Sequence, residues 1–216
     1  MRTLIAGCAL LCGLAALDLA AQSPSRTFGL TVTHSLGSGI SAHPPPCWTG
    51  CVAGDVLAPL SLSTLEIELA VPLRTRDRWG LEYHLRVVPL AMMRDNPTQP
   101  ATRSGLRWSL PMTTARASTF GFGIKPAGLR GWIGGDDLRL EADASAGILR
   151  FGTPLLAANA AQLNFVYEMG VGLRVSWLAR GGVVVGYRRH HVSNAGLAEV
   201  NPGLNSHMLF VGLPIF

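Results

Sequence analysis

The stretch that decides the fold class reads Gln162-Leu-Asn-Phe-Val-Tyr-Glu-Met-Gly-Val-Gly-Leu-Arg-Val-Ser-Trp177. Its apolar and aromatic residues recur at every second position, as Leu163, Phe165, Tyr167, Met169, Val171, Leu173, Val175 and Trp177. The opposite face is mostly polar or small and carries Gln162, Asn164, Glu168, Gly170, Gly172, Arg174 and Ser176. Successive side chains of a strand point to opposite faces, and an alternation of this length is typical of a transmembrane β-strand.

The same alternation recurs along the chain, most clearly in residues 64–73, 80–88 and 138–146. Counting such segments predicts eight strands, at residues 27–36, 63–73, 79–92, 117–125, 138–151, 162–177, 181–193 and 205–216. We therefore predict an all-β fold, an eight-stranded antiparallel transmembrane β-barrel whose lumen is filled by side chains. The link 126–137 is longer than the short periplasmic turn that this topology requires there.

The polar faces of these strands predict a buried network inside the barrel, with both signs of charge present as a lumen of low dielectric requires. Its expected members are Glu66, Glu68, Glu82, Arg86, Arg139, Glu141, Asp143, Glu168 and Arg174. The alternative is a soluble barrel or sandwich, in which the apolar faces point inward and the charges face solvent.

The N-terminal residues indicate export. An apolar segment at residues 4–17 follows a short basic start, and the small residues Ala20 and Ala21 offer a cleavage site. We expect a signal peptide at residues 1–21, followed by a single barrel domain at residues 22–216 in the outer membrane of a Gram-negative bacterium.

The cysteines that remain after cleavage are Cys47 and Cys51. An even pair in an exported loop is more often a disulfide than a metal site, and a zinc site would need two further ligands where only His43 is near. Cys8 resembles a lipoprotein processing site, but almost no apolar segment precedes it.

Composition narrows the class of partner. The net charge is +5 and the isoelectric point is about 9.5, but the basic residues are scattered and no basic run is interleaved with aromatics. This distribution argues against nucleic acid and favours an anionic lipid surface. The mean hydropathy of +0.30 is high for a soluble protein. We predict no cofactor and no metal.

A second informative stretch reads Gly186-Tyr-Arg-Arg-His-His-Val-Ser-Asn-Ala-Gly-Leu-Ala-Glu-Val-Asn-Pro-Gly-Leu-Asn205. Residues two apart on a strand point the same way, so His191 and Ser193 lie side by side, where the imidazole can accept the hydroxyl proton. Val183, Val185 and Tyr187 share that face, which should therefore be the lipid side. The strand rises toward the exterior, so the pair is expected on the outside of the wall, at the depth of the outer leaflet.

His191-Val-Ser193-Asn194, followed by Asn201-Pro-Gly203, resembles the hallmark of the lipid A deacylase family, also called acyloxyacyl hydrolases or lipid A 3-O-deacylases. The resemblance covers roughly residues 150–216. It implies an outer-membrane esterase that removes an ester-linked acyl chain from lipid A, within the lipopolysaccharide of the outer leaflet. Whether such a barrel forms a homodimer is left open.

The resemblance also implies roles for individual residues. Ser193 is the expected nucleophile and His191 the general base. Asn194, with backbone amides near Gly196, is expected to donate to the oxyanion, and Asn201 to hold the loop. Asn205 stands where well-known members have a glutamate.

Asn205 keeps a second hypothesis open. An asparagine carbonyl can fix the histidine tautomer but cannot stabilise the imidazolium by charge. Glu199 is an alternative carboxylate in the connecting loop. The runner-up function is a non-catalytic small barrel with a structural or adhesive role. The remaining histidines permit a surface cluster of His190, His191 and His207, or a metal site, and we expect Trp132 and Trp177 to be anchors at the membrane interface.

Overall fold

The computed structural model describes residues 26–42, 56–58, 60–95, 118–155, 160–179, 181–198 and 201–215. Their strands are β1 (Thr27–Ala42), β2 (Val56–Ala58), β3 (Leu60–Arg76), β4 (Trp79–Asp95), β5 (Thr119–Gly134), β6 (Leu138–Phe151), β7 (Leu163–Val175), β8 (Val183–Ser193) and β9 (Pro202–Pro214). A short 3-10 helix, η1 (Ser176–Leu178), follows β7. The expected signal peptide and the pair Cys47 and Cys51 lie outside the described residues.

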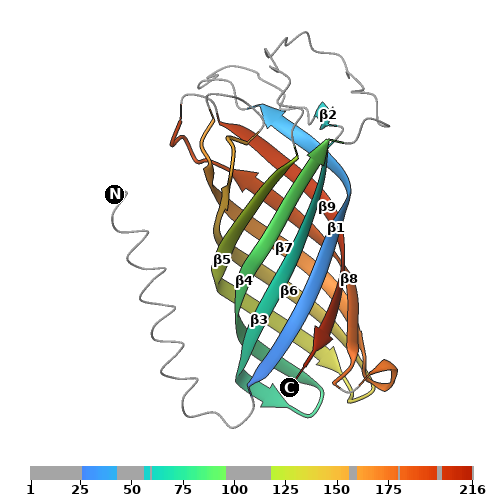
Figure 1. Cartoon of the computed structure of the whole chain (residues 1–216). Helices are drawn as coiled ribbons and strands as arrows, with labels where there is room; N and C mark the ends of the chain where they lie inside the picture. The colour runs from blue at the N-terminus through green and yellow to red at the C-terminus, as the bar shows by residue number, and fades with distance from the viewer. Residues whose placement is uncertain are drawn as a thin grey trace, which may run out of the picture.

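The long strands form a closed antiparallel barrel (Figure 1). Neighbours pair in the order β1-β3-β4-β5-β6-β7-β8-β9, and β1 pairs with β9 to close the wall. The short strand β2 adds only to the segment Ser38 to Ile40 of β1. The predicted eight-stranded barrel is therefore confirmed. The chain leaves β8 at the same end of the barrel as β2, opposite the C-terminal end of β9.

The predicted end of the fourth barrel strand at residue 125 is wrong. β5 continues to Gly134, which leaves a short link to β6. The register with β6 shifts between Ile124 and Ala127, on either side of Pro126. Proline has no N–H to donate, and a β-bulge lets the strand resume after it.

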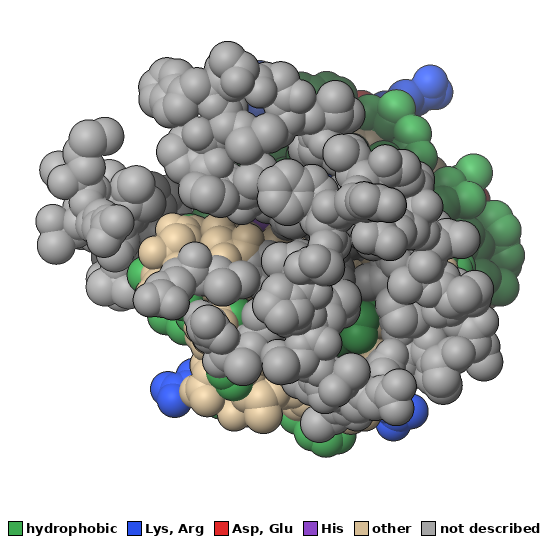
Figure 2. Space-filling view, turned by 90° about the horizontal axis from the view of Figure 1, so that it is seen from above, with side chains coloured by type: hydrophobic (Ala, Val, Ile, Leu, Met, Phe, Trp, Pro, Cys, Tyr) green, Lys and Arg blue, Asp and Glu red, His purple; other side chains and the backbone are tan. Residues whose placement is uncertain are grey.

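The outer wall is apolar. In β7, Phe165, Met169 and Val171 are exposed, whereas Asn164 and Glu168 are buried in the lumen. Hydrophobic side chains project from the periphery of the barrel in the view from above (Figure 2). This is the reverse of a soluble barrel, so the soluble alternative is wrong. No helix within the described residues is long and apolar enough to span a bilayer.

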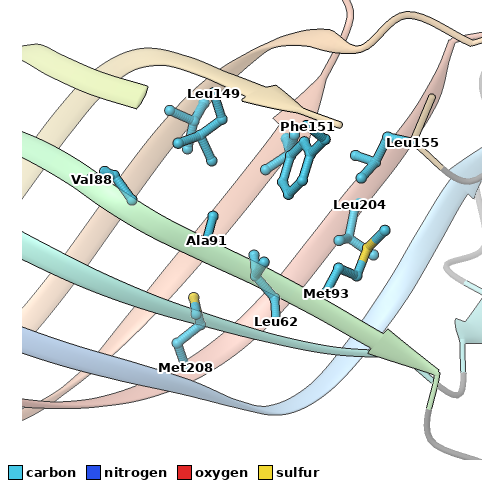
Figure 3. Close-up of a cluster of buried hydrophobic side chains, with 11 residues drawn as sticks. Leu62, Val88, Ala91, Met93, Leu149, Phe151, Leu155, Leu204 and Met208 are labelled. Carbon is cyan, nitrogen blue, oxygen red and sulfur yellow. The ribbon is translucent and has the colours of Figure 1, made fainter. Parts of the chain in front are cut away.

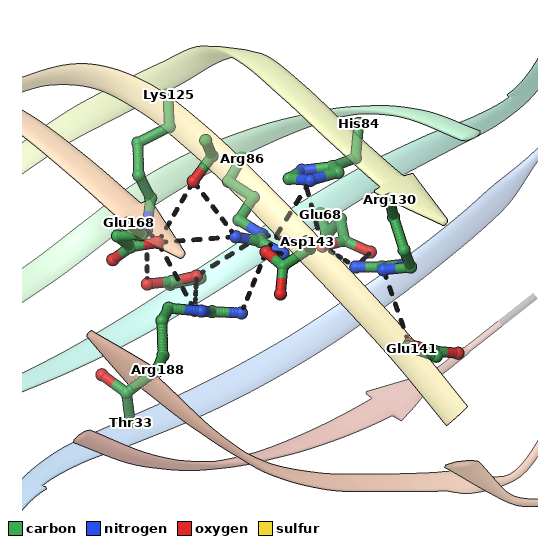
Figure 4. A network of polar contacts seen from close by, with 12 residues as sticks. Thr33, Glu68, His84, Arg86, Lys125, Arg130, Glu141, Asp143, Glu168 and Arg188 are labelled. Atoms are coloured by element: carbon green, nitrogen blue, oxygen red, sulfur yellow. Dashed lines mark hydrogen bonds and ion pairs between the residues drawn. The ribbon is translucent and has the colours of Figure 1, made fainter. Parts of the chain in front are cut away.

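The middle of the lumen holds a buried charge network (Figure 4). Lys125 Nζ lies 2.7 Å from Glu66 Oε1 and 2.8 Å from Glu168 Oε2. The predicted network is confirmed for most of its members, whereas Arg139 lies at the rim and pairs with the exposed Asp136. The network has five further buried members that the predicted set lacks, which are His84, Lys125, Arg130, Arg188 and His190.

The lumen toward the β2 end is filled by apolar side chains (Figure 3). The cluster consists of Leu62, Val88, Ala91, Met93, Leu149, Phe151, Leu155, Val166, Val192, Leu204 and Met208. Side chains therefore fill the interior, as expected for a barrel of this size. Trp132 also belongs inside, with 7% of its surface exposed, so its predicted place at the membrane interface is wrong. Trp177 is exposed in η1.

Candidate active site

The outward face of β8 carries His191 and Ser193. Val185 and Tyr187 on the same face are exposed, whereas Arg188 and His190 on the other face are each 1% exposed and lie in the lumen. The strict alternation of β8 places the pair on the outside of the wall, as predicted. The predicted surface cluster of three histidines is wrong, because His190 points inward, with its Nε2 3.5 Å from Glu168 Oε1.

Asn205 meets His191 across the ladder between β8 and β9. The two residues are directly opposite in register, and His191 Nδ1 lies 2.7 Å from Asn205 Oδ1. An amide oxygen only accepts, so Nδ1 carries the proton and Nε2 keeps its lone pair. The histidine is thus held in the tautomer that a general base for a serine hydroxyl requires.

Tyr167 covers the His191 ring from the other side. It stands opposite His191 in the ladder between β7 and β8, and the ring centroids are 4.8 Å apart with an interplanar angle of 29°. The sequence placed Tyr167 on the lipid face but gave no sign of this contact, because cross-strand register is not local information.

The loop after β8 turns sharply at Ser193. Ala195 and Gly196 have φ values of 51° and 77°, a left-handed pair that reverses the chain at once. The N–H of Asn194 donates to Asn201 Oδ1 over 2.9 Å, so Asn201 contacts the backbone at the start of this loop. The N–H of Gly196 donates to Asn194 Oδ1 over 2.9 Å. This bond must open if the Gly196 amide is to bind an oxyanion. If the bond stays closed, another donor must bind the oxyanion.

The outer wall carries other polar pairs that lack this arrangement. The hydroxyl of Tyr187 and Nδ1 of His207 form a hydrogen bond, and the two rings also stack. His34 Nδ1 lies 2.8 Å from Ser63 Oγ. No three acidic, histidine or cysteine side chains within the described ranges are grouped to hold a metal ion. Glu199 lies outside those ranges.

Together, fold and site define an apolar-walled β-barrel with a serine and histidine pair on its outer face, beside the loops at one end. The model of the family "Lipid A 3-O-deacylase (PagL)" matches residues 77–214. The chain therefore belongs to this family. Family membership and the apolar wall place it in the outer membrane of a Gram-negative bacterium.

The individual relatives match less of this chain than the family model does, or share few identical residues with it. The lipid A deacylase PagL of Pseudomonas aeruginosa is 37% identical over 83 residues, which is 38% of this chain and 46% of that protein. The crystal structure of the outer membrane enzyme PagL aligns with 88% of this chain and all of its own, at a TM-score of 0.49 and 16% identity. Neisserial surface protein A aligns with 88% of this chain and 99% of its own, at 0.39 and 10%.

Proposed function

We propose that the protein is an outer-membrane esterase that hydrolyses an ester-linked acyl chain of lipid A, with Ser193 as nucleophile and His191 as general base. The observation that carries the proposal is the hydrogen bond from His191 Nδ1 to Asn205 Oδ1 on the outward face of β8. It leaves Nε2 free to take the proton of a serine two residues away on the same face.

The reaction takes two steps. In the first, Ser193 Oγ bonds to the acyl carbonyl carbon while its proton passes to His191 Nε2. The tetrahedral intermediate then loses the sugar oxygen, which takes that proton and leaves an acyl ester on Ser193. In the second, water attacks the acyl ester, His191 relays the proton, and a free fatty acid departs from the regenerated serine.

The substrate must come from the membrane. His191 and Ser193 open toward lipid, and charged and apolar side chains fill the lumen behind them. A lipid A molecule in the outer leaflet can therefore present its ester without leaving the bilayer. The Asn194 side chain and the amides of the loop after Ser193 are the candidate oxyanion donors, each worth roughly 3 kcal/mol in typical hydrolases.

The neutral Asn205 favours the second candidate, a non-catalytic barrel with a structural or adhesive role. A carboxylate in that position would stabilise the imidazolium by charge, which an amide does not do. Against this candidate stands the geometry at His191, because an ordered tautomer and an adjacent serine serve no evident purpose in a passive wall.

Mass spectrometry of lipid A separates the two candidates. Lipid A from cells that express the wild-type protein should be lighter by one acyl chain, and lipid A from cells that express Ser193→Ala should not. Ser63→Ala is the matched control, because Ser63 also bonds an outward histidine on the same wall. Deacylation by Ser193→Ala would refute the assigned nucleophile. No deacylation by the wild type, when all three proteins are folded in the outer membrane, would favour the structural barrel.

A further inference from the structure

The ring of Tyr167 packs on the imidazole of His191. The two ring centroids lie 4.8 Å apart, while Asn205 bonds the Nδ1 edge of the imidazole. His191 is therefore held by one residue on each neighbouring strand, β7 and β9. About half of the Tyr167 side chain is exposed to the lipid side.

The proposed reaction creates a specific difficulty at this place. When His191 takes the serine proton it becomes a cation, and the residue at its Nδ1 edge is a neutral amide. A cation beside lipid has little solvent to stabilise it. A positive charge within about 6 Å of a tyrosine ring centroid is, however, attracted by the negative face of that ring.

We propose that Tyr167 is a positioning residue for His191, and that its ring face stabilises the imidazolium which Asn205 cannot stabilise by charge. This inference rests on the proposed esterase function. The ring holds the imidazole in the plane in which Nδ1 meets Asn205 and Nε2 stays free. It also makes the protonated base more stable than the hydrogen bond alone would allow.

Steady-state kinetics on purified lipid A in detergent micelles test the inference. Tyr167→Leu keeps an apolar side chain toward lipid but removes the ring, and it should lower kcat roughly 2- to 30-fold with KM unchanged. Tyr167→Phe keeps the ring face and should retain most of kcat. Tyr187→Leu is the matched control, since Tyr187 stacks on the uninvolved His207 of the same wall, and it should leave kcat unchanged.

A second background tests the stabilisation by charge. In Asn205→Glu, a carboxylate stabilises the imidazolium of His191 by charge. Adding Tyr167→Leu to this variant should therefore lower kcat by a clearly smaller factor than it does in the wild type. An equal loss in both backgrounds would refute the electrostatic part of the inference. Three results would refute the role of the ring face. They are an equal fall of kcat in Tyr167→Leu and Tyr167→Phe, a change of KM without a change of kcat in Tyr167→Leu, and an equal fall of kcat in the control Tyr187→Leu.

A measurement independent of activity separates this inference from the proposed function. In Ser193→Ala, nuclear magnetic resonance should show the His191 ring protons shifted upfield by the Tyr167 ring current. The shift should vanish in Tyr167→Leu and persist in Tyr167→Phe. Its absence from the parent would refute the positioning role. A wild-type protein with no esterase activity would refute the proposed function and the imidazolium role, while the ring-current shift would still decide the positioning role.

Discussion

Lys125→Met tests whether the charge network in the lumen holds the barrel together. Lys125 is 1% exposed and is the cation nearest to the equally buried Glu66 and Glu168, so its removal leaves the two carboxylates with only their longer contacts to Arg86 and Arg188. Breaking a buried ion pair by removing one partner costs about 3–5 kcal/mol, and methionine fills nearly the same space. The free energy of unfolding should fall by that amount.

Urea unfolding of the protein in lipid vesicles, followed by tryptophan fluorescence, measures the loss. Arg150→Met at the exposed outer end of β6 is the control, with an expected change within about 0.5 kcal/mol. Adding Glu168→Gln to Lys125→Met should recover part of the stability. A loss in Lys125→Met no larger than in Arg150→Met would refute the reasoning, because it would mean that water solvates these carboxylates inside the barrel.

Three further predictions concern the site and the wall. A Cβ at Gly186 would lie 2.3 Å from the Val171 carbonyl oxygen, so Gly186→Ala should reduce folding yield in a gel-shift assay, whereas Gly135→Ala, with open space around it, should not. Asn201→Ala leaves the N–H of Asn194 without its acceptor and should lower kcat/KM at least about fivefold, whereas Asn201→Asp, which keeps an acceptor, should lose less. Val171→Arg places a charge on the lipid face and should cost roughly 2–4 kcal/mol of unfolding free energy in vesicles but little in detergent.

Local alternation was enough to predict most of the barrel. It assigned the lipid and lumen faces of β7 and β8 and therefore the outward direction of His191 and Ser193. It failed at Pro126, where a residue that cannot donate to the ladder resembles a strand end. A strand that ends at residue 125 excludes Arg130, which is buried in the lumen. A bulge is a tertiary accommodation, and the period of the sequence does not report it.

Cross-strand contacts required the structure. The family resemblance predicted that Asn205 acts on His191, and the register places the two side chains within hydrogen-bond distance. Nothing in the sequence set Tyr167 opposite His191, since a shift of the register by two residues would have kept every side chain on its face. The same holds for the bond between the Asn194 amide and Asn201, which depends on how the loop folds.

The two faces of β8 link stability to chemistry. Arg188 on the inner face lies 3.2 Å from Glu66 and 3.5 Å from Glu168, which fixes the strand from within the lumen. His191 on the outer face depends on the same strand for its register with β7 and β9. A variant that weakens the ion pairs of Arg188 should therefore shift the His191 ring relative to Tyr167 and Asn205 before the barrel unfolds. The buried network is thus part of the support of the site, although none of its side chains faces the lipid.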